Sequence, residues 1–130
     1  MAITVGMTHS VSVVVDSSNT ADFAGSGSLP VFATPFMIAL MEHAAAELCQ
    51  KELEDGITTV GTNINVSHLA ATGKGAVVKA VATVTSADGR RFTFDVEAYD
   101  NAGLIGKGTH ERFSVKIDKF MAKAEERKAL

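Results

Sequence analysis

The hydrophobic pattern of the chain is dominated by one long, mostly apolar stretch between positions 31 and 50. Within residues 36–48 only three side chains are polar, namely Glu42, His43 and Glu47. Three polar residues are too few to form a solvated face along the whole stretch. The pattern therefore predicts a long helix whose first three turns are buried nearly all round.

Both ends of this helix carry typical end signals. Thr34 is a preferred N-cap residue, and Pro35 fits the first helical position because its missing N–H leaves no helical hydrogen bond unmade. The polar pattern of the last turns continues to Asp55, and Gly56 is a typical left-handed stop. We expect the helix to begin near Thr34 and to end near Asp55.

Five other runs have the composition and alternation of β-strands, and they span residues 7–15, 57–69, 76–87, 91–100 and 104–117. Asp88 and Gly89 form a strong two-residue hairpin signal between two of these strands. Turn-forming residues fill positions 16–30, and loops of that length are often lids or binding loops. The charged tail from Asp118 to Leu130 predicts a short surface helix or a frayed end.

The strand predicted over residues 57–69 carries several polar residues of interest. Simple alternation puts the even-numbered residues from Val60 to His68 on one face, and Thr59 and Gly61 on the other. The face with the aliphatic side chains should pack against the helix. His68 is therefore predicted on the helix side of the sheet.

One strand, a long apolar helix and four further strands predict an α+β fold, in which a curved antiparallel five-stranded sheet wraps around one long helix. At 130 residues the chain should form a single domain over residues 1–130. Joining the exposed edges of two such sheets would cover them, so the topology also predicts a homodimer. Whether two dimers associate further is left open.

The amino-acid composition excludes several classes of function for this chain. The chain has 12 Lys and Arg against 15 Asp and Glu, a net charge of -3, which argues against nucleic-acid binding and against a basic membrane-binding patch. We see no transmembrane stretch, and Met1 to Val5 do not begin a signal peptide, so the cytoplasm is the expected location. The single Cys49 is expected to be a small buried hydrophobe.

Local motifs exclude several kinds of site. The four histidines are spread over positions 9, 43, 68 and 110 without metal-ligand spacing, so no metal site is predicted. The stretch from Gly103 to Thr109 superficially evokes a phosphate loop. It lies in a strand pattern with no helix after it, and we reject that reading.

Glu42 is the residue of the helix that most needs an explanation. Carboxylates are rarely buried without a partner, because desolvation disfavours their charged form. One interpretation is that the side chain of Glu42 reaches solvent at the edge of the buried surface and pairs with His43 or a basic residue. The other is that Glu42 is a catalytic carboxylate, and the helix alone does not decide between them.

Three stretches together, residues 31–42, 60–68 and 108–112, resemble hotdog-fold acyl-CoA thioesterases. The chain is most similar to the fluoroacetyl-CoA thioesterase group, and the likeness covers nearly the whole chain in order and spacing. The resemblance implies a sheet wrapped around a helix, a dimer with sites near the subunit interface, and an acyl-CoA substrate. It implies no cofactor, because coenzyme A is part of the substrate.

The resemblance also implies roles for five residues. Thr34, Glu42 and His68 correspond to the catalytic triad of the group, and Gly61 and Arg112 correspond to its substrate-binding residues. A thioester carbonyl needs a nucleophile, a proton carrier and donors to the developing oxyanion. Glu42 could attack the carbonyl directly or activate water, and the sequence does not separate these routes.

The segment before the helix departs from the group. The fluoroacetyl-selective member carries aromatic residues in a lid at this point, whereas this chain has Gly25-Ser-Gly-Ser-Leu29, and Phe23 is the only aromatic residue of the loop. Arg112 is the first choice for meeting anionic groups of coenzyme A, and the weaker choices are Lys74, Arg90 and Arg91.

Two other functions stay open at the level of sequence. A hotdog hydratase or dehydratase acting on acyl-CoA would use the same carboxylate and histidine differently. A non-catalytic module that binds or senses acyl-CoA would need the pocket but has no evident need for Glu42 beside a histidine.

Overall fold

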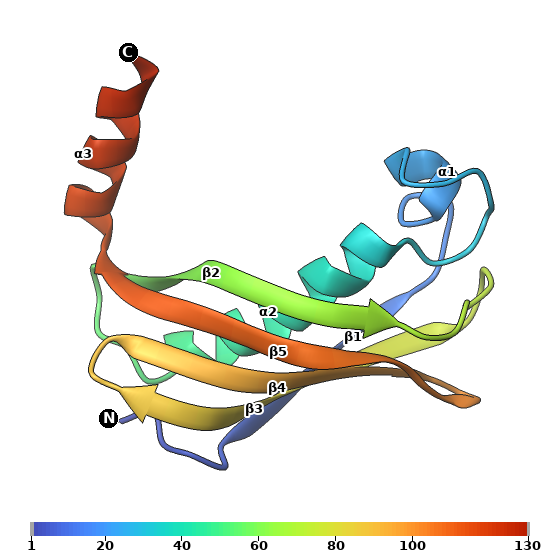
Figure 1. Cartoon of the computed structure of the whole chain (residues 1–130), viewed down its shortest axis with the longest axis horizontal. Helices are drawn as coiled ribbons and strands as arrows, with labels where there is room; N and C mark the ends of the chain where they lie inside the picture. Colours follow the sequence, from blue (N-terminus) through green and yellow to red (C-terminus); the bar gives the residue numbers. More distant parts are fainter. Residues whose placement is uncertain (1, 130) are drawn as a thin grey trace.

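Five antiparallel strands form one sheet that curves around the long helix α2 (Figure 1). The structure is a computed structural model that describes residues 2–129. In the sheet the strands follow the order β1-β3-β4-β5-β2. Their bounds are β1 Thr8–Val14, β2 Ile57–His68, β3 Val77–Asp88, β4 Arg91–Asp100 and β5 Gly103–Lys116. The helices are α1 Ala21–Ala24, α2 Thr34–Gln50 and α3 Ile117–Lys128.

The predicted curved sheet around one helix is confirmed, and each predicted strand is present with ends shifted by at most one residue. β1 and β2 form the two edges of the sheet. The expected hairpin at Asp88 and Gly89 joins β3 to β4, and Gly89 has the left-handed φ of 62° that this turn requires.

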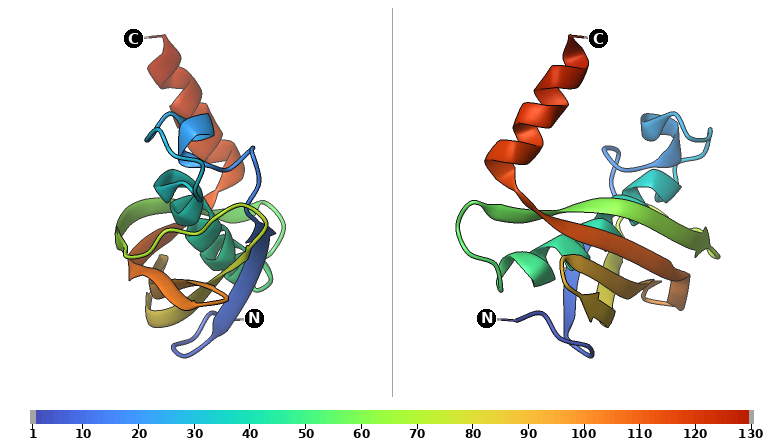
Figure 2. Two further views of the ribbon diagram at one scale, coloured as in Figure 1. Left: turned by 90° about the vertical axis from the view of Figure 1, so that its right-hand side faces the viewer. Right: turned by 60° about the vertical axis from the view of Figure 1, so that its left-hand side comes forward.

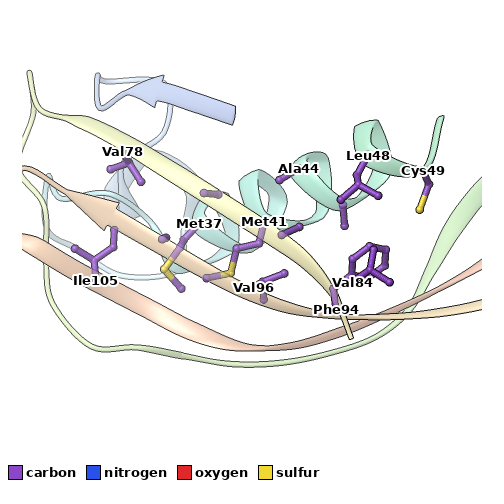
Figure 3. Close-up of a cluster of buried hydrophobic side chains, with 14 of the residues drawn as sticks. Met37, Met41, Ala44, Leu48, Cys49, Val78, Val84, Phe94, Val96 and Ile105 are labelled. Atoms are coloured by element: carbon purple, nitrogen blue, oxygen red, sulfur yellow. The ribbon is translucent and has the colours of Figure 1, made fainter. Parts of the chain in front are cut away.

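The core lies between α2 and the concave face of the sheet (Figure 3). One side of α2 contributes Met37, Met41 and Leu48, and the strands contribute Phe94, Val96 and Ile105, all fully or almost fully buried. The alternation predicted for β4 is confirmed, because Phe92, Phe94, Val96 and Ala98 are all buried.

The predicted ends of α2 were wrong in detail. Ala33 is the N-cap residue and makes no side-chain cap, while Thr34 is the first helical residue and uses its hydroxyl elsewhere. The helix ends at Gln50 instead of Asp55, because Lys51 to Asp55 offer little apolar surface to pack on the sheet. Gly56 does adopt a left-handed φ of 85°, but in the turn that enters β2.

The expectation that α2 is buried nearly all round was also wrong for the single chain. Pro35, Ala39, His43 and Glu47 are exposed along the side of the helix that the sheet does not cover. The five-stranded sheet is too narrow to encircle the helix. A mostly apolar helix is therefore left open on one side.

A bulge near Thr62 overturns part of the facing predicted for β2. The pairing of β2 with β5 shifts by one residue between Gly61 and Asn63. Because an extra residue reverses the alternation, Thr59 and Gly61 face the helix, and Val60 does not. Beyond the bulge the prediction holds, and His68 lies on the helix side of the sheet.

The tail and the long loop also contain helices. The tail forms α3, which projects away from the sheet (Figure 2). The loop of residues 16–30 contains α1, and short bridges from Thr20 to Phe32 and from Val31 to Gly73 hold the segment around it. Among the described residues no helix is both long enough and apolar enough to span a membrane.

Removing one core ring tests this packing. Phe94 is completely buried, so Phe94→Ala should lower the free energy of unfolding by about 3–5 kcal/mol through lost burial and a cavity. Urea denaturation at fixed protein concentration measures this change. The matched control is Asp95→Ala on the exposed face of the same strand, which should change stability by less than about 0.5 kcal/mol. Equal effects of the two substitutions would contradict the described core.

Candidate active site

Arg112 of β5 is the fixed point of one cluster of polar residues. Its guanidinium is buried, and it donates hydrogen bonds from Nε to Oγ1 of Thr59 at 2.8 Å and from Nη2 to the carbonyl of Thr59 at 3.0 Å. Its Nη1 lies 3.7 Å from Oε2 of Glu42. Hydrogen bonds from a charged group contribute about 1.5–3 kcal/mol each, whereas exposed ion pairs contribute about 0–1 kcal/mol. Thr59 therefore positions Arg112, and Arg112 in turn meets Glu42.

Glu42 is less buried than the apolar pattern suggested. Its side chain is 40% exposed on the open side of α2, and its ionic partner is the buried Arg112. Glu42 therefore has the basic partner that one of the two sequence interpretations expected, and this partner leaves the catalytic interpretation open. His43 instead pairs with Glu47, with His43 Nε2 2.8 Å from Oε2.

Gly61 lets the carboxylate of Glu42 approach the backbone of β2. A Cβ atom at position 61 would lie 2.6 Å from Oε2 of Glu42 and 3.2 Å from Cε1 of His110. Such a distance is too short for a real contact, so an added Cβ would push the flexible carboxylate of Glu42 away from the strand. Glycine at position 61 thus allows the observed position of this carboxylate, and its backbone conformation does not itself demand glycine.

His110 belongs to this cluster, and no role was predicted for it. It is 2% exposed, and its Nδ1 lies 2.7 Å from the carbonyl oxygen of Asn63, which can only accept a hydrogen bond. Nδ1 therefore carries the proton, and Nε2 accepts from Nη1 of Arg112 at 3.2 Å. Burial lowers the pKa of His110, which favours this neutral form. His110 lies two positions before Arg112 on β5 and therefore shares its face of the sheet. This spacing is the sequence signal that could have identified His110 as a site residue.

Thr34 and His68 form a second pair at the start of α2. Oγ1 of Thr34 lies 2.8 Å from Nδ1 of His68. Among residues 2–129, Nε2 of His68 finds no hydrogen-bond partner although it is buried. Burial also lowers the pKa of His68. Buried polar atoms are nearly always satisfied, so an atom that lacks a partner is a candidate for contact with a ligand.

A cavity of about 280 Å³ adjoins this pair. Thr34 and His68 form part of its wall, and the other lining residues are Ala21, Ser26, Val31, Phe32, Leu69, Ala70 and Ala71. Most of these side chains are small or apolar. The cavity has room for a small organic group beside the ring of His68, whose Nε2 is buried and without a partner.

The structure does not bring all five predicted site residues together. Glu42, Gly61 and Arg112 form one cluster, and Thr34 and His68 form another. Thr34 and Glu42 are eight residues apart on one helix, which is about 12 Å along its axis. A single chain therefore holds these residues in two separate clusters, which we call the Glu42 half-site and the His68 half-site.

The weaker candidates for anion binding lie elsewhere. Nε of Arg91 pairs with Oε1 of Glu111 at 2.6 Å, and Nζ of Lys74 donates to Oγ of Ser17 at 3.1 Å. Arg90 lines a separate groove beside α3. In the part of the chain that the structure describes, no group of three or more potential ligands could hold a metal ion.

The curved sheet, its single long helix and the two polar clusters place the chain in the hotdog class of thioesterases. Two solved structures support this directly. A mutant of the fluoroacetyl-CoA-specific thioesterase FlK superimposes with a TM-score of 0.92 at 35% identity, covering 98% of each chain. A thioesterase superfamily member from Thermus thermophilus gives 0.90 at 32% identity, over 98% of this chain and 95% of the other.

Within that class the sequence defines the family. The model of the family described as fluoroacetyl-CoA-specific thioesterase matches residues 15–118. A fluoroacetyl-CoA thioesterase from Streptantibioticus cattleyicolor is 43% identical over 97 residues, which cover 75% of this chain and 70% of the relative. The chain belongs to the fluoroacetyl-CoA-specific thioesterase family, as the sequence motifs predicted, and it is a thioester hydrolase.

The buried setting of His68 predicts its behaviour with pH. Because burial lowers its pKa from 6.5, the ring should stay neutral at pH 6.5 and take up a proton only in more acidic solution. The unfolded chain binds that proton near pH 6.5, so this residue should also reduce stability as the pH falls below 6.5 through the folded-state pKa.

An NMR titration of the histidine rings measures this pKa. His68→Gln assigns the signal, and His43→Gln serves as an exposed control. A pKa for His68 above 6.5 would show that burial does not govern this ring.

Proposed function

We propose that this chain hydrolyses short acyl-CoA thioesters to the free acid and coenzyme A, with Thr34, Glu42 and His68 as catalytic residues. The observation that carries the assignment of His68 is its buried Nε2 without a partner beside a small cavity. Glu42 is the second reactive group, because Arg112 and Gly61 hold its carboxylate at the edge strand while leaving it 40% exposed.

The reaction consumes one water molecule and breaks the C–S bond. Either Glu42 activates water for attack on the carbonyl carbon, or Glu42 attacks and water then hydrolyses the resulting anhydride. In the first route the neutral ring of His68 accepts a proton released from water and delivers it to the departing thiolate. In the second route the thiolate leaves before water attacks and takes its proton from solvent, and the ring then accepts a proton from the water that hydrolyses the anhydride and returns it to solvent. Thr34 fixes the ring by hydrogen bonding to Nδ1, which directs Nε2 toward the substrate.

The cavity favours a small acyl group. About 280 Å³ lined largely by small side chains leaves room for a short acyl chain beside His68. The loop that precedes α2 carries Gly25 to Leu29 where the fluoroacetyl-selective group has aromatic residues, and this segment is exposed. We therefore propose a preference for short acyl groups in general, without a special preference for fluoroacetyl.

We also propose a homodimer in which each site takes residues from both chains. β2 is a twelve-residue edge strand, and its outer side is free to pair with the β2 of a second copy. The two-fold axis of this strand pair would lie near Asn65. With the bulge at Thr62 in each chain, the residues of one β2 that face its helix would then lie opposite the helix-facing residues of the other β2. It would also set His68 opposite the partner's Gly61, and so bring the two half-sites together.

Exposed apolar residues at the two ends of β2 support this arrangement. Phe23, Leu29 and Leu69 are 56–64% exposed near the end of β2 that carries His68. Ile117 and Met121 of α3 are 40% and 49% exposed near the end that carries Ile57. An antiparallel pairing of two β2 strands would place the first set of one chain against the second set of its partner. The two-fold symmetry would repeat this contact at the other end of the interface.

Two substitutions test the catalytic assignment. Glu42→Gln and His68→Ala should each lower kcat/KM by about 100-fold or more while the fold survives, because each removes a reactive group and leaves the core intact. Thiol release from a panel of short acyl-CoAs measures this, and circular dichroism checks the fold. Exposed Glu54→Gln is the control. Binding of acyl-CoA by wild type without thiol release would instead indicate a binding module.

Mixing the two inactive variants tests the shared site. If Glu42 and His68 act across the interface, a mixed dimer contains one intact site and one doubly altered site. Unfolding and refolding an equal mixture should then restore roughly a quarter of the wild-type rate, because half the dimers are mixed and each has one working site. Sedimentation confirms the dimer. No recovery in verified mixed dimers would show that both residues act within one chain.

A further inference from the structure

A basic groove lies between α3 and the adjoining ends of β2 and β5. Its volume is about 500 Å³. The lining residues are Ile57, Arg90, Ser114, Val115, Lys116, Lys119, Phe120 and Lys123. Half of these eight residues are cationic and none is acidic.

The cations of this groove are free to meet a ligand. Within residues 2–129 the ion pairs between side chains do not involve Arg90, Lys116, Lys119 or Lys123, and all four are exposed. Lys116, Lys119 and Lys123 repeat at spacings of three and four residues, so α3 presents them on one face. Phe120 lies on the same face and adds an aromatic surface 41% exposed to solvent.

Part of the groove shares a face of the sheet with the Glu42 half-site, since Ser114 and Lys116 lie on the side of Arg112, whereas Val115 lies on the other side. Lys116 pairs with Ile57, and Arg112 pairs with Gly61, in the regular part of the β2–β5 ladder before the bulge. Positions 112, 114 and 116 therefore point to the same side. The separation between Gly61 and Ile57 is four residues, about 13 Å along an extended strand. α2 does not cover the end of this face, because it stops at Gln50, whose amide bonds to the carbonyl of Ile57.

We infer that this groove binds the phosphorylated nucleotide end of coenzyme A while the thioester lies at Gly61. The inference rests on the proposed function. The pantetheine arm between thiol and diphosphate has about as many chain bonds as four to five amino-acid residues, so it spans about 14–16 Å when extended. That length matches the separation of the groove from Gly61. Phosphates suit a cluster of unpaired lysines, and the adenine ring suits the face of Phe120.

Charge reversal at two positions tests the groove. Lys119→Glu/Lys123→Glu should raise KM for acyl-CoA about tenfold or more and leave kcat within about twofold, because the phosphates lose attractive charge while the reacting groups stay in place. The same variant should hydrolyse the matching acyl-pantetheine, which lacks phosphates, with wild-type kinetics. The control is Lys79→Glu on β3, which reverses one exposed lysine away from α3 and should leave the kinetics on both substrates unaffected.

Direct binding separates this inference from the proposed function. Calorimetry with adenosine 3′,5′-bisphosphate should show binding to wild type that the double variant loses and Lys79→Glu retains, whether or not any thioester is hydrolysed. Failure of wild type to release thiol would thus overturn the function alone. The inference itself would be overturned by equal losses on acyl-CoA and acyl-pantetheine, by unchanged KM for acyl-CoA, or by losses confined to an acyl carrier protein substrate.

Discussion

The buried guanidinium of Arg112 is the interaction on which the Glu42 half-site depends. A buried cation must have its donors satisfied, and here Thr59 takes two of them and His110 a third. These contacts join β2 to β5 at the level where the bulge begins. The remaining positive face is directed at Glu42 of α2. One side chain thus ties two strands and the helix together at the candidate site.

The two half-sites differ in how firmly their residues are held, since one is rigid and the other is more open. Around Arg112 the partners are buried and hydrogen-bonded, so the guanidinium that faces Glu42 is held in one position. Around His68 the ring is held at one nitrogen only, beside a cavity of about 280 Å³ under the loop that contains α1. Such a division suits an enzyme that holds its thioester group firmly while the loop sets which acyl group fits. It also agrees with a helix left open on one side, since the second copy that we propose would cover that side.

Much of this could be predicted from the sequence, for physical reasons that differ by element. The alternation of Phe92, Phe94, Val96 and Ala98 predicted which residues of β4 face the core, because alternate residues of a strand lie on one face and the apolar set must be the buried one. The family, and with it the five candidate residues, followed from motifs that retain order and spacing. The roles of those five residues stay predictions. What failed was local: one extra residue at Thr62 reversed the facing of Thr59 and Gly61, and no pattern of single residues announces a bulge. His110 was missed because a lone histidine in a strand looks like any other until its partners are known.

The bulge decides which side chains β2 presents to the helix. If Thr62 paired regularly with β5 instead of standing outside the ladder, every residue of both half-sites would still be present in the sequence. Regular alternation would then rotate residues 57–61 by half a turn about the strand, sending Thr59 and Gly61 away from the helix and Val60 toward it. Arg112 would lose the acceptor of two hydrogen bonds, and the carboxylate of Glu42 would face an isopropyl group. The information that holds the site together is thus stored partly in how the two strands pair, and a list of residue types alone would not record it.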